Sequence, residues 1–178
     1  MKKALWSLVP LALLLAGCGS PEQDTTELAS ASPLASSGST ASFTPEEVGE
    51  YLVTVGGCHD CHTPGFSEVG WEVPESQYCL GGDFGWTGPW GTTYAPNLRL
   101  SVQNLTEDAW VEMLRTRTAL PPMPWPNINR MHEDDMRAIY RYLVSLGPAG
   151  DPAPAALQPG QESSTPYVVL APPQGLPE

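Results

Sequence analysis

Five consecutive residues, Cys58-His59-Asp60-Cys61-His62, carry the strongest chemical signal in the chain. Two thiols three positions apart, followed at once by an imidazole, form a C-x-x-C-H motif, which is the pattern for covalent attachment of a c-type haem. Cys58 and Cys61 would each form a thioether bond with one haem vinyl group, and His62 would bind the iron from one side. The motif therefore predicts one covalently attached haem c.

The C-x-x-C part of the motif has two other common roles, as half of a zinc site or as a thiol–disulfide redox pair. A closed zinc site needs four ligands, but Cys18 and Cys79 are isolated in the sequence, and His132 has no partner at ligand spacing. A thioredoxin-like pair lies in a βαβ unit, whereas the residues before Cys58 follow a helical pattern. We therefore favour haem attachment, and we expect Cys79 to be a small buried apolar residue.

The N-terminus has the features of an export signal. Two lysines precede an apolar run over residues 4–16, which is short for a membrane span. The run leads into Leu-Ala-Gly-Cys at residues 15–18, which resembles the bacterial lipobox, whose cysteine is lipidated and becomes the first mature residue. We expect residues 1–17 to be a lipoprotein signal peptide and Cys18 to carry the lipid, so that the protein is membrane-anchored and faces the periplasm or the cell exterior. A plain secretory signal that contains a cysteine is the alternative.

The chain is strongly acidic, with 20 Asp and Glu against 8 Lys and Arg. Both lysines lie in the predicted signal peptide, so the mature chain would hold six arginines and no lysine. This balance excludes nucleic acid as a partner, because phosphates need basic groups, and it does not suit polybasic attachment to anionic lipid. It fits either solubility or steering towards redox protein partners with a basic docking surface.

Composition divides the mature chain into three parts. Residues 18–43 are rich in Ser, Ala and Thr and predict a flexible tether. Residues 44–147 are long enough for one small core, and they form the predicted haem domain. Residues 148–178 hold eight prolines and predict an irregular, extended tail, in which the apolar segment 167–170 docks on the domain.

The first predicted helix begins at Pro45, with Thr44 as N-cap and Glu47 completing a capping box, and it ends before Gly56. Its expected apolar face consists of Val48, Tyr51, Leu52 and Val55.

Two further helices are predicted, one from Thr106 to about Arg117 and one from Glu133 to Leu146, before a Gly-Pro exit. Residues 63–103 are rich in Gly and Pro and predict loops with at most short turns or strand pieces. The sequence thus predicts an all-α fold without a substantial sheet, in which about three helices are wrapped by loops around one covalent haem.

This layout resembles a class I-type c cytochrome over roughly residues 44–147. Residues 91–98 (GTTYAPNL), 121–125 (PPMPW) and 131–146 are similar, in the same order, to phrases of a bacterial monohaem branch of that family. With the lipobox, the resemblance implies the lipoprotein form of such a cytochrome. It also implies a distal methionine in the interval between the last two helices.

The candidates for the second axial ligand are Met113, Met123, Met131, Met136 and His132. Met113 and Met136 lie on predicted apolar helix faces. Met123 lies in Pro-Pro-Met-Pro-Trp-Pro, whose prolines stiffen the loop, and the resemblance implies a methionine ligand in this interval. We favour Met123, followed by Met131, with an open or His-ligated iron as the remaining alternative. A His/Met pair fills both axial sites and suits electron transfer.

Other side chains are expected to contact the haem or to orient its ligand. The candidate contacts, which would bond the propionates or pack on the porphyrin, are Trp90, Tyr94, Asn97, Arg99 and Trp125. His62 should donate its ring N–H to a backbone carbonyl, for which Pro64 is the candidate. His59 and Asp60 occupy the free positions of the motif and need no functional role.

The leading hypothesis is a lipid-anchored c-type cytochrome that carries single electrons between membrane or periplasmic redox partners and is not itself an enzyme. The second hypothesis is a haem-bearing subunit or domain of a periplasmic oxidoreductase, either a dehydrogenase or a sulfur-compound oxidising enzyme. A haem sensor is the third. Carbon monoxide binding distinguishes these hypotheses, because a six-coordinate electron carrier does not bind carbon monoxide whereas sensors and many haem enzymes do.

Overall fold

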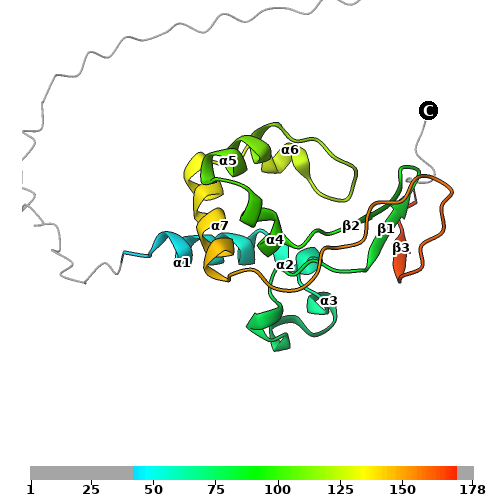
Figure 1. Cartoon of the computed structure of the whole chain (residues 1–178), viewed down its shortest axis with the longest axis horizontal. Helices are drawn as coiled ribbons and strands as arrows, with labels where there is room; N and C mark the ends of the chain where they lie inside the picture. The colour runs from blue at the N-terminus through cyan, green and yellow to red at the C-terminus, as the bar shows by residue number, and fades with distance from the viewer. Residues whose placement is uncertain (1–41, 172–178) are drawn as a thin grey trace, which may run out of the picture. The chain divides into compact units, whose positions relative to one another are not determined.

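The computed structural model describes residues 42–171; the predicted signal peptide, Cys18 and nearly all of the predicted tether lie outside this range. Helices, three 3-10 turns (η) and three strands follow one another along the described chain (Figure 1). In order they are α1 (Pro45–Val55), α2 (Cys58–His62), α3 (Phe66–Val69), η1 (Gly70–Glu72), η2 (Glu75–Gln77), β1 (Gly85–Gly88), β2 (Gly91–Tyr94), α4 (Leu98–Ser101), η3 (Val102–Asn104), α5 (Glu107–Thr116), α6 (Trp125–Ile128), α7 (Glu133–Ser145) and β3 (Tyr167–Val169). Within residues 42–171, no helix combines the length and the apolar character that a membrane span requires.

The three long helices α1, α5 and α7 confirm the three predicted helices, and the predicted N-caps Thr44 and Thr106 are confirmed as well. Thr44 and Glu47 form the predicted capping box of α1, and the hydroxyl of Thr106 accepts a hydrogen bond from the Ala109 N–H at the start of α5. His132 is the N-cap of α7, and its ring accepts a 3.4 Å hydrogen bond from the Asp134 N–H. Local capping and apolar spacing therefore determine these three elements.

Helix α1 crosses α7, and the point of closest approach is a glycine (Figure 1). A Cβ atom added at Gly49 would lie 2.1 Å from the carbonyl oxygen of Ala138 and 2.7 Å from Cβ of Tyr142. Only hydrogen fits at this position, so Gly49 allows the two backbones to meet. The predicted apolar face of α1 was partly wrong, because Tyr51 and Val55 are 63% and 59% exposed and the buried residues are Gly49 and Val53.

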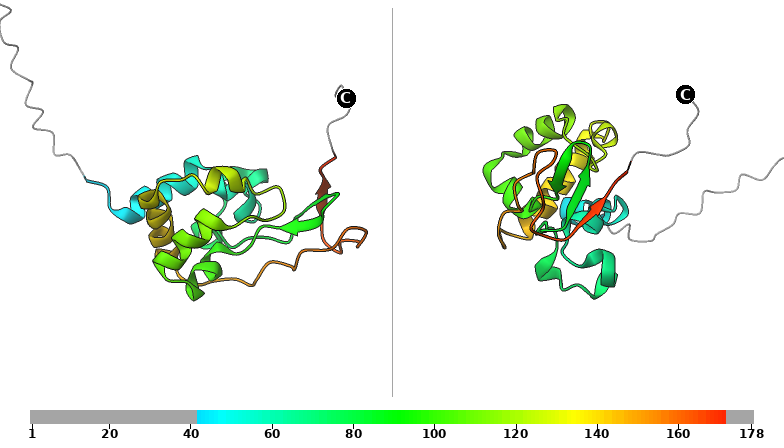
Figure 2. Two further views of the ribbon diagram at one scale, coloured as in Figure 1. Left: turned by 90° about the horizontal axis from the view of Figure 1, so that it is seen from above. Right: turned by 90° about the vertical axis from the view of Figure 1, so that its right-hand side faces the viewer.

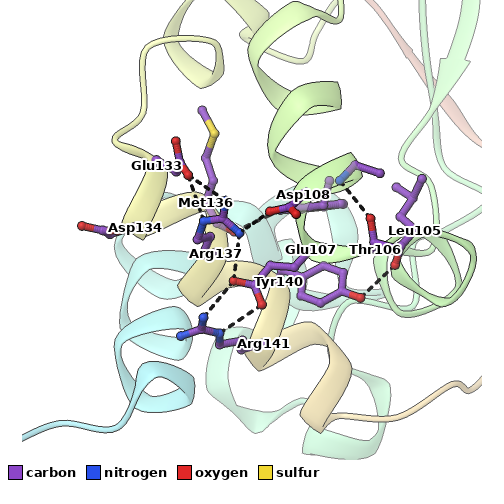
Figure 3. A network of polar contacts seen from close by, with 12 residues as sticks. Leu105, Thr106, Glu107, Asp108, Glu133, Asp134, Met136, Arg137, Tyr140 and Arg141 are labelled. Atoms are coloured by element: carbon purple, nitrogen blue, oxygen red, sulfur yellow. Dashed lines mark hydrogen bonds and ion pairs between the residues drawn. The ribbon is translucent and has the colours of Figure 1, made fainter.

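Ion pairs join α5 to α7 on the outer side of the helical core (Figure 3). The guanidinium of Arg137 lies 2.7 Å from the Glu133 carboxylate and 2.8 Å from that of Asp108, and it also contacts Glu107. Arg141 pairs with Glu107 at 2.8 Å. One carboxylate, that of Glu107, therefore binds two arginines from successive turns of α7 and fixes the two helices relative to each other.

The expectation of an all-α fold was wrong, because the described residues also contain a three-stranded sheet in the order β2-β1-β3. Strands β1 and β2 form an antiparallel hairpin with Gly85 opposite Tyr94 and Gly88 opposite Gly91. Strand β3, from the proline-rich tail, pairs in parallel with β1. The sheet lies at one end of the helical core (Figures 1 and 2).

The tail is bound along the domain before it forms β3. Thr92 and Leu157 exchange backbone hydrogen bonds of 3.0 and 2.8 Å, and the hydroxyls of Tyr94 and Ser163 lie 2.9 Å apart. Gly91, with φ of 101°, makes room for this approach, because a Cβ there would meet the carbonyl oxygen of Leu157 at 2.0 Å. The predicted docking of segment 167–170 is confirmed, and it takes the form of a strand.

Candidate haem-binding site

The C-x-x-C-H motif folds as a single helical turn, α2, which follows α1 after Gly56 and Gly57. Cys58 and Cys61 are free thiols, both partly exposed, and their three-residue spacing places them about one turn apart. Burial raises the pKa of both thiols, with Asp60 contributing to each. A redox-active dithiol needs the opposite shift, so this environment disfavours the thiol–disulfide alternative. Within the described residues, no group of three or more His, Cys, Asp or Glu side chains is arranged to hold a metal ion, as a zinc site would require.

The imidazole of His62 is held in the orientation that an iron ligand needs. Its Nδ1 lies 2.9 Å from the carbonyl oxygen of Pro96, and the ring is only 6% exposed. Since a carbonyl oxygen only accepts, Nδ1 must carry the proton, which leaves the lone pair on Nε2. Burial lowers the pKa of His62, although the Pro96 bond opposes this shift, and the ring therefore stays neutral. The prediction that Pro64 supplies this carbonyl was wrong, because the partner is Pro96.

Two buried indole groups provide a test of whether the site suits a haem. The Nε1 atoms of Trp90 and Trp125 are shielded from solvent, and neither has a hydrogen-bond partner among residues 42–171. A buried donor without an acceptor costs roughly 1–3 kcal/mol. An anionic group such as a haem propionate would satisfy either donor. The donor set of two thiols, one oriented imidazole and two free indole N–H groups thus fits a haem.

Three other predicted contacts, Tyr94, Asn97 and Arg99, are engaged within the protein. The Tyr94 hydroxyl faces Ser163 of the tail. The Asn97 amide donates to the carbonyls of Ala149 and Asp151, at 2.8 and 3.3 Å, and its oxygen caps α4. Arg99 is 7% exposed and donates to backbone carbonyls, including those of Leu146 and Gly147 at the end of α7. These bonds give all three side chains structural roles, and haem contacts by Tyr94 and Asn97 stay predictions.

Met123 lies between α5 and α6 in a loop that is tied to its surroundings. The Thr93 hydroxyl donates to the Pro121 carbonyl at 2.6 Å, which joins the loop to β2. The Asn129 amide donates to the carbonyls of Leu114 and Arg117, and the Arg117 guanidinium lies 5.2 Å from the centre of the Trp125 ring. Met123 itself is partly exposed.

The other ligand candidates occupy different positions. Met136 is fully buried in the core, and its carbonyl accepts a hydrogen bond from the Trp110 indole. Met113 and Met131 are partly buried and pack against that core. The His132 side chain is 74% exposed. Its position does not suit an iron ligand, and ligation by Met123 stays a prediction.

His59 occupies a free position of the motif, yet it is 2% exposed, a feature that sequence reasoning missed. Its Nδ1 lies 2.7 Å from the Thr63 hydroxyl, which also accepts the backbone N–H of Cys79 at 3.0 Å. The rings around it belong to Phe66, Trp71 and Tyr78, at centroid distances of 4.7 to 5.5 Å. Three aromatic side chains in the 16 residues immediately after the C-x-x-C-H motif are the sequence signal that could have revealed this cluster.

Cys79 is fully buried in the helical core, as expected for a small apolar residue. Burial raises the pKa of its thiol to about 12, with Cys58 contributing and Arg99 opposing. A thiol with this pKa carries no thiolate at neutral pH. Its surroundings therefore favour packing over a role as a reactive ligand.

Neither His62 nor Met123 lines either of two surface clefts in the described part of the chain. The first, of about 380 Å³, is lined by Glu46, Glu47, Glu50, Glu75, Ser76, Arg99, Tyr142, Ser145 and Leu146. The Tyr142 hydroxyl is buried and has no hydrogen-bond partner within the described part of the chain. The second, of about 300 Å³, lies between residues 94–101 and residues 152–154 of the tail.

The chain is similar to the fructose dehydrogenase cytochrome subunit of Gluconobacter japonicus, at 27% identity over 122 residues. The match covers 62% of this chain but only 23% of that protein, so the chain spans about a quarter of the relative's length. No family model matches the chain, and no solved structure matches it significantly. With the C-x-x-C-H motif, the similarity supports a haem-bearing electron-transfer role.

Proposed function

We propose that this protein is a haem-bearing electron-transfer subunit of an oxidoreductase, with one haem c bound covalently through Cys58 and Cys61. The observation that carries the proposal is the His62 ring, whose Nδ1–H donates to the Pro96 carbonyl at 2.9 Å and whose Nε2 lone pair is left for iron. A carbonyl partner of this kind fixes the orientation of a metal-ligating histidine and raises its basicity.

The remaining residues of the site have separable tasks. The indole N–H groups of Trp90 and Trp125, both buried without acceptors within residues 42–171, would bind the propionates. Met123, in the proline-rich loop between α5 and α6, would be the second protein ligand of the iron. When bound, the haem supplies a one-electron couple. A His/Met pair raises its reduction potential and closes both axial sites to small molecules.

The similarity to a dehydrogenase's cytochrome subunit favours the subunit hypothesis over that of an independent carrier. A one-electron site of this kind has no group for substrate chemistry, so the oxidation of a substrate takes place on a partner protein. The acidic composition fits a partner with a basic docking surface. We further propose that the protein is exported and anchored to a membrane through lipidated Cys18, because haem attachment to this motif in bacteria takes place outside the cytoplasmic membrane.

Carbon monoxide binding to the haem-loaded full chain tests the proposed ligand set. The ferrous wild-type protein is expected to be low-spin and not to bind carbon monoxide. Met123→Ala is expected to open one axial site and to bind carbon monoxide, whereas Met131→Ala, the matched control, leaves the spectrum unchanged. Carbon monoxide binding by the wild type would refute the electron-transfer proposal. If Met131→Ala rather than Met123→Ala opens the site, the assignment moves to Met131.

A further inference from the structure

The segment after the haem motif forms a small lobe, residues 66–78, that the proposed function does not explain. It comprises α3, η1 and η2, which are too short to bury residues of their own, and it projects from the helical core in two views (Figures 1 and 2). Its aromatic rings meet around His59. Phe66 stacks on the imidazole at 5.2 Å between centroids, and Trp71 meets it edge-on at 5.5 Å.

The lobe connects the protein surface directly to the haem-attachment turn. Trp71 is 58% exposed, and the centroid of its ring lies 4.9 Å from that of Phe66. His59, the centre of the ring cluster, stands between the two cysteines that would carry the haem. A protein that contacts Trp71 is therefore separated from the attachment turn by a single layer of packed rings.

The outer face of the lobe has the composition of a docking surface. Trp71 and Val69 expose 58% and 51% of their area, and partly exposed tryptophans are typical anchors of protein interfaces. From Cys58 to Leu98 the sequence contains five acidic residues and no Lys or Arg. All five acids are exposed: Asp60, Glu68, Glu72, Glu75 and Asp83. The patch is thus apolar at its centre, and the exposed charged side chains of this segment are all acidic.

The negative surface continues beyond the lobe. Glu75 also lines the 380 Å³ cleft, together with three glutamates of α1 and the Tyr142 hydroxyl that has no partner within the described residues. Arg99 also lines this cleft, but it is only 7% exposed, and its guanidinium donates to the backbone carbonyls of Ser76, Leu146 and Gly147 rather than to a carboxylate. Arg115, Arg137 and Arg141 form ion pairs between α5 and α7. A long basic side chain from a partner would find four glutamates in this cleft, none of which forms an ion pair with Arg99.

We infer that the lobe is the docking surface for the redox partner of the proposed function, on which this inference rests. The partner it fits is a protein with an apolar patch for Trp71 and Val69, ringed by lysine or arginine side chains for the glutamates. In the docked complex the partner's donor centre would lose one electron and be oxidised, and the bound haem would take up that electron and be reduced. A second copy of this chain does not fit, because it carries the same acidic surface.

Electron exchange with a lysine-rich cytochrome c, used as a basic probe protein, tests the inference on the haem-loaded full chain by stopped-flow spectroscopy. The triple variant Glu68→Gln/Glu72→Gln/Glu75→Gln is expected to lower the second-order rate about tenfold at low ionic strength, and the difference should vanish as salt rises. Trp71→Ala should lower it about tenfold at any salt concentration, because it removes the apolar anchor.

Matched controls separate docking from net charge and from folding. Glu112→Gln/Asp151→Asn/Glu162→Gln removes the same three charges from exposed positions outside the lobe and the cleft. Phe43→Ala removes an aromatic ring that is 76% exposed. Both controls should leave the rate within about twofold of the wild type. Trp71→Phe, which keeps a ring against the cluster, checks that any loss in Trp71→Ala is not due to unfolding of the lobe.

The outcomes distinguish this inference from the proposed function. If dithionite reduces the haem, carbon monoxide does not bind, and the lobe variants and their controls exchange electrons equally fast, the docking surface lies elsewhere while the proposed function stands. A similar loss in both triple variants would also overturn the inference, since net charge alone would explain it. If the wild type binds carbon monoxide, the proposed function fails first.

Discussion

Replacing Gly49 by alanine should disrupt the helix crossing that supports the haem-attachment turn. The new Cβ would lie 2.1 Å from the carbonyl oxygen and 2.6 Å from the carbonyl carbon of Ala138, and 2.7 Å from Cβ of Tyr142. Cβ atoms essentially never approach other atoms below 3.0 Å, so α1 and α7 must separate by about 0.9 Å at this point. Two of the three obstructing atoms belong to the backbone and cannot rotate away.

Two opposing terms set the size of the effect. Alanine is favoured over glycine in a helix interior by about 0.8–1 kcal/mol. Overpacking typically costs about 1–3 kcal/mol and occasionally more. Because the clash is with backbone, and because Val53 and Leu143 beside the crossing are fully buried, we take the upper end of that cost. The net loss in the free energy of unfolding is then about 2 kcal/mol, a large share of the roughly 5–15 kcal/mol of a small domain.

Urea and thermal unfolding of the haem-loaded protein measure this loss. For a domain of this size, about 2 kcal/mol lowers the midpoint temperature by roughly 8 °C. Glu50→Ala is the matched control, because it introduces the same residue one position along α1 at an exposed site, and it should change the stability by less than about 0.5 kcal/mol. A Gly49→Ala protein as stable as the wild type would refute the close crossing of α1 and α7.

Two further predictions concern His59 and Asn97. Burial lowers the pKa of His59. As pH falls, the unfolded chain therefore takes up a proton on this residue, at the ordinary pKa near 6.5, before the folded protein does. The free energy of unfolding should then fall as pH drops below about 6.5, by at most about 1.4 kcal/mol per pH unit. Urea midpoints at pH 7.5 and 5.5 should differ less for His59→Phe than for the wild type, and equal differences would show that His59 titrates freely. Asn97→Ala should cost about 1–2 kcal/mol and expose residues 148–166 to limited proteolysis, because the amide both caps α4 and binds the tail. Asn104→Ala, at an exposed position, should show neither effect, and an unchanged digestion pattern in Asn97→Ala would mean that other bonds hold the tail.

The helices and the haem motif were predictable because their signals are local. Thr44 and Glu47 cap a helix three residues from each other, and the Cys58 to His62 motif needs only five positions. The face of α1 was less predictable. Counting large apolar residues favoured Tyr51, whereas a close backbone crossing buries Gly49, which such a count ignores.

The sheet and the histidine environment could not be predicted because they depend on residues far apart in the sequence. Strand β1 is half glycine, with little intrinsic strand preference, and besides its hairpin with β2 it pairs with the distant tail, which places Tyr167 opposite Gly85. The partner of His62 is Pro96, 34 positions away, rather than the nearby Pro64. In both cases the deciding contact is with a backbone group, which leaves no mark in side-chain patterns.

The lobe of residues 66–78 and the C-terminal tail both bind near the same short turn, α2. On one side, the lobe packs its rings on His59, and the Thr63 hydroxyl receives the N–H of Cys79. On the other side, Pro96 receives the His62 N–H, and the next residue, Asn97, binds the tail. Since one turn anchors both additions, a displacement of either is transmitted to the orientation of His62. The lobe and the tail therefore both help to determine the position of the proposed iron ligand His62.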